Sequence, residues 1–123
     1  MSAKSYGQFA ETALRDELTA RGYLCIRSAA SKALDLICVR PGGSSVGLEC
    51  KRTHGRAIYV STSARMREQQ AFLQRCNTYG LQTYYAVMFG DGTLELFRPS
   101  VSIMREGQGE QLGDVFPPLH TAP

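Results

Sequence analysis

One hairpin pattern constrains this fold more than any other part of the sequence. Residues 34–40 and 46–51 are two short segments rich in apolar side chains, and the five residues between them, 41–45, read Pro-Gly-Gly-Ser-Ser. Proline and glycine in such a link strongly favour a turn. We therefore expect two antiparallel strands, with the start of the first strand beside the end of the second.

Three charged side chains belong to that end of the expected hairpin. Asp35 lies near the start of the first strand, and Glu49 and Lys51 end the second. Alternate residues share a face of a strand, so Glu49 and Lys51 project together, roughly 6.5–7 Å apart, and Cys50 points the other way. Paired carboxylates suit a hard divalent cation such as magnesium, and an adjacent lysine can orient a water molecule or stabilise phosphate charge. The chemistry indicated is metal-assisted hydrolysis of a phosphodiester.

These residues also have structural interpretations. Glu49 and Lys51 could simply form an ion pair on one face of the strand. Asp35 is harder to explain in that way, because it interrupts an apolar run and an isolated buried carboxylate is costly. We favour a metal ligand at both Asp35 and Glu49.

Positive charge is concentrated just beyond the expected site. The net charge is only +3, but residues 50–67 contain no Asp or Glu. The basic residues of this stretch are Lys51, Arg52, Arg56, Arg65 and Arg67. Such a patch would hold a polyanionic substrate through phosphate contacts and counterion release, although a solvated basic loop is an equal alternative on charge alone. His54, a lone histidine among these arginines, is expected to be exposed rather than catalytic.

The cysteine pattern disfavours a zinc site. Cys25, Cys38, Cys50 and Cys76 form no Cys-x-x-Cys pair, and the sequence has only two histidines to join them. We expect buried free thiols, which suit a cytoplasmic protein. The N-terminal residues lack an apolar signal core and no apolar run is long enough to cross a bilayer, so neither secretion nor membrane insertion is expected.

Two segments have the periodicity of amphipathic helices. Apolar residues recur at helical spacing over residues 4–21, and Gly22 follows as a stop. Serine and threonine at 61–63 can cap a second helix that reaches Tyr79, with Gly80 after it. The residues expected on its buried side are Met66, Gln69, Leu73, Cys76 and either Phe72 or Tyr79.

The remaining strand patterns complete one sheet. Residues 23–28 alternate, residues 83–89 are strongly apolar, and a Gly-Asp-Gly turn leads into residues 93–98. Residues 57–60 are expected to extend this sheet briefly. The order of helices and strands predicts an α/β fold, with a mixed central β-sheet of about five strands flanked by two helices.

The length of 123 residues fits one compact domain. We expect that domain to span residues 1–106. Beyond it the periodicity is weak and glycine and proline recur, so residues 107–123 are expected to form a loosely ordered C-terminal tail.

This order of elements and acidic residues resembles the PD-(D/E)XK nuclease superfamily and, within it, the archaeal-type Holliday junction resolvases. The resemblance runs over residues 6–99. The matching positions are Glu11, residues 27–31, Asp35-Leu36-Ile37, Glu49-Cys50-Lys51, Ile58-Tyr59-Val60 and residues 96–99. An Asp and a Glu-x-Lys pair arise often by chance, whereas the ordered set is fairly specific. One departure is Leu34, which replaces the proline that precedes the aspartate in the family.

The resemblance implies a restriction-endonuclease-like core and a magnesium-dependent endonuclease, with manganese as a substitute, that resolves four-way junctions. Asp35 and Glu49 would bind the metal together with the backbone carbonyl of Cys50, and Lys51 would position the attacking water. Glu11 and Ser31 would complete the active site, Glu11 being directed toward the metal.

The resemblance also implies how the protein holds its substrate. Arg27 would contact the DNA backbone, and we assign the same role to Lys32, Arg52, Arg56, Arg65 and Arg67. Gln69 resembles a glutamine that could orient Lys51 or a water molecule, although it could instead satisfy backbone groups between helix and sheet. Two cuts on opposed strands imply a homodimer, with the second helix and the last hairpin as candidate interfaces.

Two other functions fit the same residues. The nuclease chemistry could act on flaps, nicks or a restriction sequence instead of a junction. A non-catalytic DNA-binding module could also retain this fold.

Overall fold

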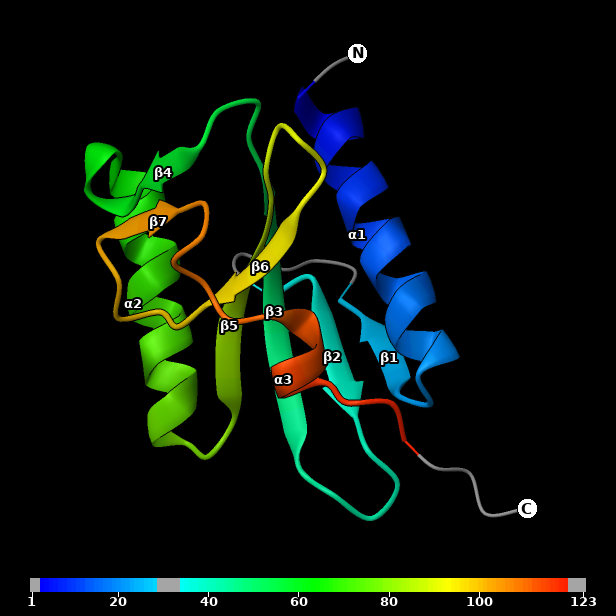
Figure 1. The fold of residues 1–123 in the computed structure, drawn as a ribbon. Helices are drawn as coiled ribbons and strands as arrows, with labels where there is room; N and C mark the ends of the chain where they lie inside the picture. Colours follow the sequence, from blue (N-terminus) through cyan, green and yellow to red (C-terminus); the bar gives the residue numbers. More distant parts are fainter. Residues whose placement is uncertain (1–2, 29–33, 120–123) are drawn as a thin grey trace.

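The structure, a computed structural model, describes residues 3–28 and 34–119, without the side chains of residues 3–10 (Figure 1). Its centre is a five-stranded mixed sheet in the order β1-β2-β3-β5-β6. The strands are β1 (Leu24–Arg27), β2 (Leu36–Val39), β3 (Ser45–Arg52), β5 (Gln82–Met88) and β6 (Leu94–Phe97). Helix α1 (Ala3–Ala20) covers one face and helix α2 (Ala64–Thr78) covers the other. This arrangement confirms the predicted fold class.

Alternation along the strands divides the core into two clusters. Tyr84 and Ala86 of β5 face α1 and pack in a cluster with Leu14 and Leu18. The intervening residues of β5 face α2, where Tyr85 and Val87 pack with Leu73. A strand buried on both faces has few polar positions to alternate, which explains why residues 83–89 are almost uniformly apolar.

The hairpin predicted from the sequence forms as expected. Strands β2 and β3 are antiparallel, with Leu36 opposite Leu48. Strand β3 also pairs in parallel with β5, and this pairing sets Glu49 beside Tyr85. The second predicted hairpin joins β5 to β6, and the Asp91 carboxylate in its turn accepts the Thr93 N–H at 3.0 Å.

The expectation that residues 57–60 extend the main sheet is wrong. Strand β4 (Ala57–Tyr59) pairs antiparallel with β7 (Ile103–Arg105) in a separate two-stranded sheet, and Val60–Thr62 form a short 3-10 helix. The chain leaves the main sheet after β3, where the Gly90 backbone packs so closely on the His54 carbonyl that any Cβ at Gly90 would clash. The Gly55 carbonyl accepts the Gly90 N–H at 3.4 Å, and β4 begins two residues later.

Helix α2 begins as predicted, with the Ser63 hydroxyl accepting the Met66 N–H at 3.0 Å. Its buried residues are Gln69 and Leu73. Phe72 and Tyr79, one of which was expected on the buried side, are instead 45% and 78% exposed. The helix therefore turns two aromatic side chains toward solvent.

The described part of the C-terminal segment packs against the core, in contrast to the loose tail expected from residue 107 onward. Helix α3 (Leu112–Val115) is followed by Phe116, which is fully buried and packs edge-on against Tyr23 with ring centroids 5.2 Å apart. The buried Glu95 carboxylate accepts the Gly107 and Gly109 N–H groups at 2.8 Å. The aromatic contact, the hydrogen bonds to Glu95 and further hydrogen bonds to backbone groups hold this segment, and none of them produces a periodic pattern in the sequence.

No helix among the described residues is both long and apolar enough to cross a membrane.

Candidate active site

The two carboxylates of the hairpin meet at the end of the β2–β3 ladder. The ladder begins with Leu36 opposite Leu48, and Asp35 immediately precedes it. The Asp35 N–H donates to the Leu48 carbonyl at 2.8 Å, and the Asp35 carboxylate accepts the Cys50 N–H, also at 2.8 Å. A side-chain oxygen thus occupies the place where a longer β2 would offer a backbone carbonyl. This substitution fixes the Asp35 carboxyl group beside Glu49.

The Glu49 carboxyl group shares this site with Asp35 and is buried, with 5% of the residue exposed. Burial, a hydrogen bond with the Asp35 side chain and the charge of Asp35 together raise the pKa of Glu49 to about 9. The positive charges of Lys51 and Arg65 oppose that rise. Two carboxylates this close cannot both ionise cheaply, so the pair retains one proton at neutral pH. A cation in place of that proton would remove the repulsion.

The Cys50 backbone offers a third oxygen on the same side of β3. The N–H and C=O groups of one strand residue face the same neighbour, and the Cys50 N–H faces Asp35. The Cys50 carbonyl therefore faces the side on which Asp35 lies. The thiol packs with the α1 cluster on the opposite face from Glu49, as strand alternation predicts, and burial raises its pKa.

Two carboxylates and a carbonyl form an oxygen donor set that fits a hard divalent cation. Magnesium is commonly held by one or two carboxylates, with water and substrate phosphate completing its coordination. In the part of the chain that the structure describes, no group of three or more His, Cys, Asp or Glu side chains could hold a metal ion. The donor set therefore depends on Asp35 and Glu49.

Glu11, on α1, lies near this pair, but its carboxylate interacts with a different residue. Its carboxylate forms an ion pair with the Arg27 guanidinium of β1, with the Arg27 Nε 2.9 Å from Glu11 Oε1. Burial and the nearby charge of Asp35 raise the pKa of Glu11, against the opposing charges of Arg27 and Arg15. Glu11 thus lies within electrostatic reach of the site, and its ion pair holds Arg27 at the edge of the sheet.

Two basic side chains act on the carboxylate pair. Lys51 follows Glu49 at the end of β3 and is half-buried, and Arg65 is exposed in the first turn of α2. The charge of each lowers the pKa of Glu49. The site therefore combines a negative pair with positive groups on its solvent side, an arrangement suited to a phosphate that approaches a cation.

Tyr85 is a neighbour of the site that sequence reasoning missed. It lies beside Glu49 in the parallel register and is fully buried. Burial and the Glu49 charge raise the pKa of Tyr85 to about 12, and its hydroxyl has no hydrogen-bond partner among the described residues. A tyrosine within an apolar strand resembles any core aromatic, so only the register of β3 and β5 reveals this contact.

A comparison with known protein families shows which family this chain belongs to. The sequence model of a family described as archaeal Holliday junction resolvase (Hjc) matches residues 2–112. This chain belongs to that resolvase family. It is a nuclease that hydrolyses DNA at four-way junctions, as the sequence resemblance implied, and resolvases of this kind generally depend on a metal ion.

A solved structure has the same fold as this resolvase. The match is to Hjc, a Holliday junction resolvase of the archaeal hyperthermophile Archaeoglobus fulgidus, with a TM-score of 0.73 and 18% sequence identity. The match covers 94% of this chain and 99% of that one. No curated protein sequence matches this chain.

The remaining predicted residues of the resolvase fall into three groups. Ser31 and Lys32 lie outside the described residues. Gln69 is buried on the sheet-facing side of α2, one turn before Leu73. The arginines of the basic stretch lie at the end of β3, next to β4 and on α2.

These arginines occupy different parts of the fold. Arg52 ends β3 and is half-buried. The Arg67 guanidinium donates to the Ser61 carbonyl at 2.6 Å, and Arg56 lies next to β4, where its carbonyl accepts the Glu106 N–H. Arg65 is therefore the exposed arginine of this stretch whose charge reaches the carboxylate pair.

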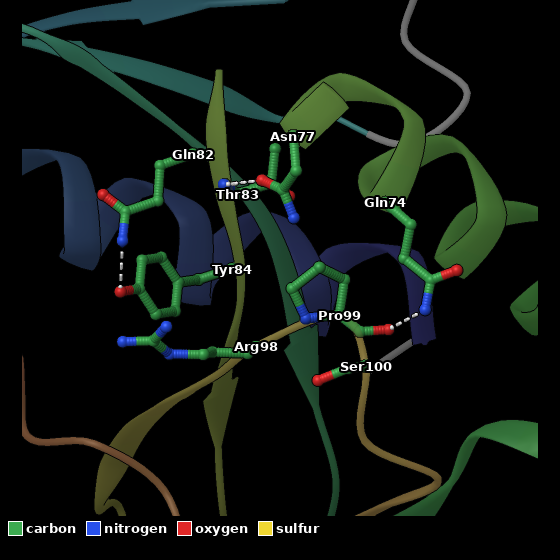
Figure 2. Close-up of a pocket in the computed structure, with 8 residues that line it drawn as sticks. All are labelled: Gln74, Asn77, Gln82, Thr83, Tyr84, Arg98, Pro99 and Ser100. Carbon is green, nitrogen blue, oxygen red and sulfur yellow. Dashed lines mark hydrogen bonds between the residues drawn. The ribbon is translucent and has the colours of Figure 1, made fainter. Parts of the chain in front are cut away.

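A cavity of about 290 Å³ lies apart from this chemistry, between the end of α2 and the start of β5 (Figure 2). Its lining residues are Gln74, Asn77, Gln82, Thr83, Tyr84, Arg98, Pro99 and Ser100. Several of its polar groups satisfy one another, since Gln82 donates to the Tyr84 hydroxyl and Gln74 to the Pro99 carbonyl. Its lining residues do not include Asp35, Glu49, Lys51 or Arg65.

Proposed function

We propose that this chain resolves four-way DNA junctions with magnesium, or manganese in its place, bound between Asp35 and Glu49. The observation that carries this proposal is that the half-buried Asp35 and the buried Glu49 bring their carboxyl groups together, because two like charges in such a place are costly to the fold unless a cation binds there. The Cys50 carbonyl, on the same side of β3, would be a third ligand. Family membership supplies the substrate.

The residues around the pair support in-line hydrolysis of a phosphodiester. A divalent cation bound there would lower the pKa of a water molecule and neutralise charge on the phosphate. The Lys51 ammonium would hold the attacking water in line with the scissile bond. The Cys50 N–H would hold Asp35 in its orientation, as it does in this structure.

Several residues would bind and orient the DNA. Arg65 would contact the phosphate nearest the carboxylates, since its charge already reaches them. Glu11 would hold the half-exposed Arg27 guanidinium toward the DNA backbone and add negative charge near the metal. Ser31, Lys32, Arg52, Arg56 and Arg67 remain predicted DNA contacts or active-site groups, and Gln69 a predicted support for Lys51. The DNA substrate also supports the expected cytoplasmic location.

We further propose that the active species is a homodimer that pairs through α2. Two opposed cuts need two sites, and each chain has one carboxylate pair. The exposed Phe72 side chain lies on α2 and the exposed Tyr79 side chain directly follows the helix, with the Arg75 guanidinium 5.9 Å from the Tyr79 ring centroid. Exposed aromatic and arginine side chains are characteristic of protein interfaces. A second copy of this chain is the occupant that the two-cut reaction requires.

Junction selectivity separates this function from a nuclease that acts on other DNA. An Asp35→Asn protein should bind a labelled four-way junction in magnesium without cutting it. Excess linear duplex of the same sequence and phosphate count, at fixed salt, should displace the labelled junction poorly. Unlabelled junction should displace the labelled junction fully. Equal displacement by duplex and junction would contradict junction selectivity.

A further inference from the structure

The Tyr85 hydroxyl has no structural explanation within the fold that the structure describes. Its ring fills a cluster with Leu73, Val87 and Phe97, and the residue is fully buried. The hydroxyl has no hydrogen-bond partner among the described residues. Phenylalanine would fill the same volume without burying an unsatisfied donor, which is costly in an apolar interior. Packing therefore does not explain the Tyr85 hydroxyl, and we expect this group to have another function.

The Glu49 carboxyl is a neighbouring functional group, and its charge reaches Tyr85. Strands β3 and β5 pair in parallel with Glu49 opposite Tyr85, so both side chains project from the same face of the sheet. Both are buried beneath α2. A phenol beside a carboxylate in a dry interior is a hydrogen-bond donor facing an acceptor.

A carboxylate has two oxygens that accept hydrogen bonds, so a Glu49 carboxylate that bound a cation through one oxygen would have a second oxygen able to accept from a donor. Tyr85 is the buried donor in the adjacent register position.

We propose that Tyr85 is a positioning residue that donates its hydroxyl proton in a hydrogen bond to the Glu49 oxygen that does not bind the cation. This inference rests on the proposed cation site at Asp35 and Glu49. The hydrogen bond would fix the orientation of Glu49 and compensate its burial in the ionised form. Groups that hold a metal ligand in this way typically change metal affinity by about 10- to 100-fold when they are removed.

The test compares manganese affinity with folding stability in two tyrosine variants. Tyr85→Phe removes only the hydroxyl, and Tyr84→Phe is the matched control on the next residue. The Tyr84 hydroxyl accepts from Gln82 and belongs to the cavity in Figure 2 rather than to the carboxylate site. Calorimetric titration of the full-length chain with MnCl2, without DNA, gives the affinity, and thermal unfolding in EDTA gives the stability.

We expect Tyr85→Phe to bind manganese about tenfold more weakly than the wild-type chain, with an unfolding temperature in EDTA at least as high. Tyr84→Phe should bind manganese as the wild-type chain does. Unchanged manganese affinity in Tyr85→Phe, or a lower unfolding temperature in EDTA, would overturn the role of Tyr85.

A Glu49→Gln variant keeps the failure of this inference distinct from failure of the proposed function. If Glu49→Gln loses manganese binding while Tyr85→Phe retains full affinity, the result supports the cation site and contradicts only the role of Tyr85. If the wild-type chain itself binds no manganese, the result contradicts both the cation site and the role of Tyr85.

Discussion

A buried carboxylate such as Glu49 opposes folding whenever it is ionised without a cation. Its pKa rises from an ordinary 4.5 to about 9 in the folded chain, because of burial, the hydrogen bond with Asp35 and the charge of Asp35. The folded state therefore holds a proton between these pH values that the unfolded state has released. By linkage, the stabilising contribution of protonated Glu49 is complete below pH 4.5 and is lost as the pH rises through 9.

The Glu49→Gln variant should reveal this pH dependence in metal-free protein. Glutamine cannot ionise, so the variant should exceed the wild-type chain in unfolding temperature by more at pH 9 than at pH 6, by a few degrees. Thermal unfolding in EDTA at both pH values measures the difference. Glu68→Gln, at an exposed carboxylate on α2, is the control and should show no such widening. A constant difference between Glu49→Gln and wild type at both pH values would contradict the raised pKa of Glu49.

The sequence located Asp35 and Glu49 because a carboxylate in an apolar strand is conspicuous and a hairpin turn fixes which strand ends meet. Tyr85 could not be found in the same way, since its partner depends on the parallel register of β3 and β5, which are more than thirty residues apart in sequence. The ion pair between Glu11 and Arg27 could likewise not be predicted from the sequence. Local pattern reveals chemistry within one hairpin, whereas contacts between distant elements need the fold.

Helix α2 shows what periodicity cannot decide at the level of one element. Its start at Ser63 and its buried Leu73 follow from capping and spacing. Either Phe72 or Tyr79 was expected on the buried side of the helix, yet both are exposed in the described chain. An amphipathic pattern does not distinguish a side chain that packs on its own sheet from one that packs on another molecule.

The exposed face of α2 should be the dimer interface. Phe72→Glu places a charge at its centre, and a buried interface anchor is worth at least about 2 kcal/mol, or about a thirtyfold rise in the dimer dissociation constant. Sedimentation equilibrium measures that constant. Thr19→Glu, which adds the same charge at an exposed position on α1 across the sheet, should leave it unchanged. A wild-type chain that is monomeric, or a Phe72→Glu chain that dimerises normally, would contradict this interface.

Across the complete chain, the two hairpins and the two long helices were predictable because each is encoded within a short segment. The pairing of β4 with β7 and the docking of Phe116 against Tyr23 were not, because each joins segments more than forty residues apart through a few contacts. Other long-range contacts contribute to the geometry of the site. The Asp35 and Glu49 pair lies at the end of one hairpin ladder, while β5 supplies Tyr85 and α2 supplies Arg65.

Cleavage of a synthetic four-way junction is the most direct test of the proposed metal site. The wild-type chain should cut two opposed strands in MgCl2 or MnCl2 and neither strand in EDTA. Asp35→Asn should reduce the cleavage rate by at least about a hundredfold, because it removes a carboxylate that holds the cation, while junction affinity stays near that of the wild-type chain. Cleavage that persists in EDTA, or an Asp35→Asn chain that cuts at the wild-type rate, would contradict the assignment of the reaction to Asp35 and Glu49.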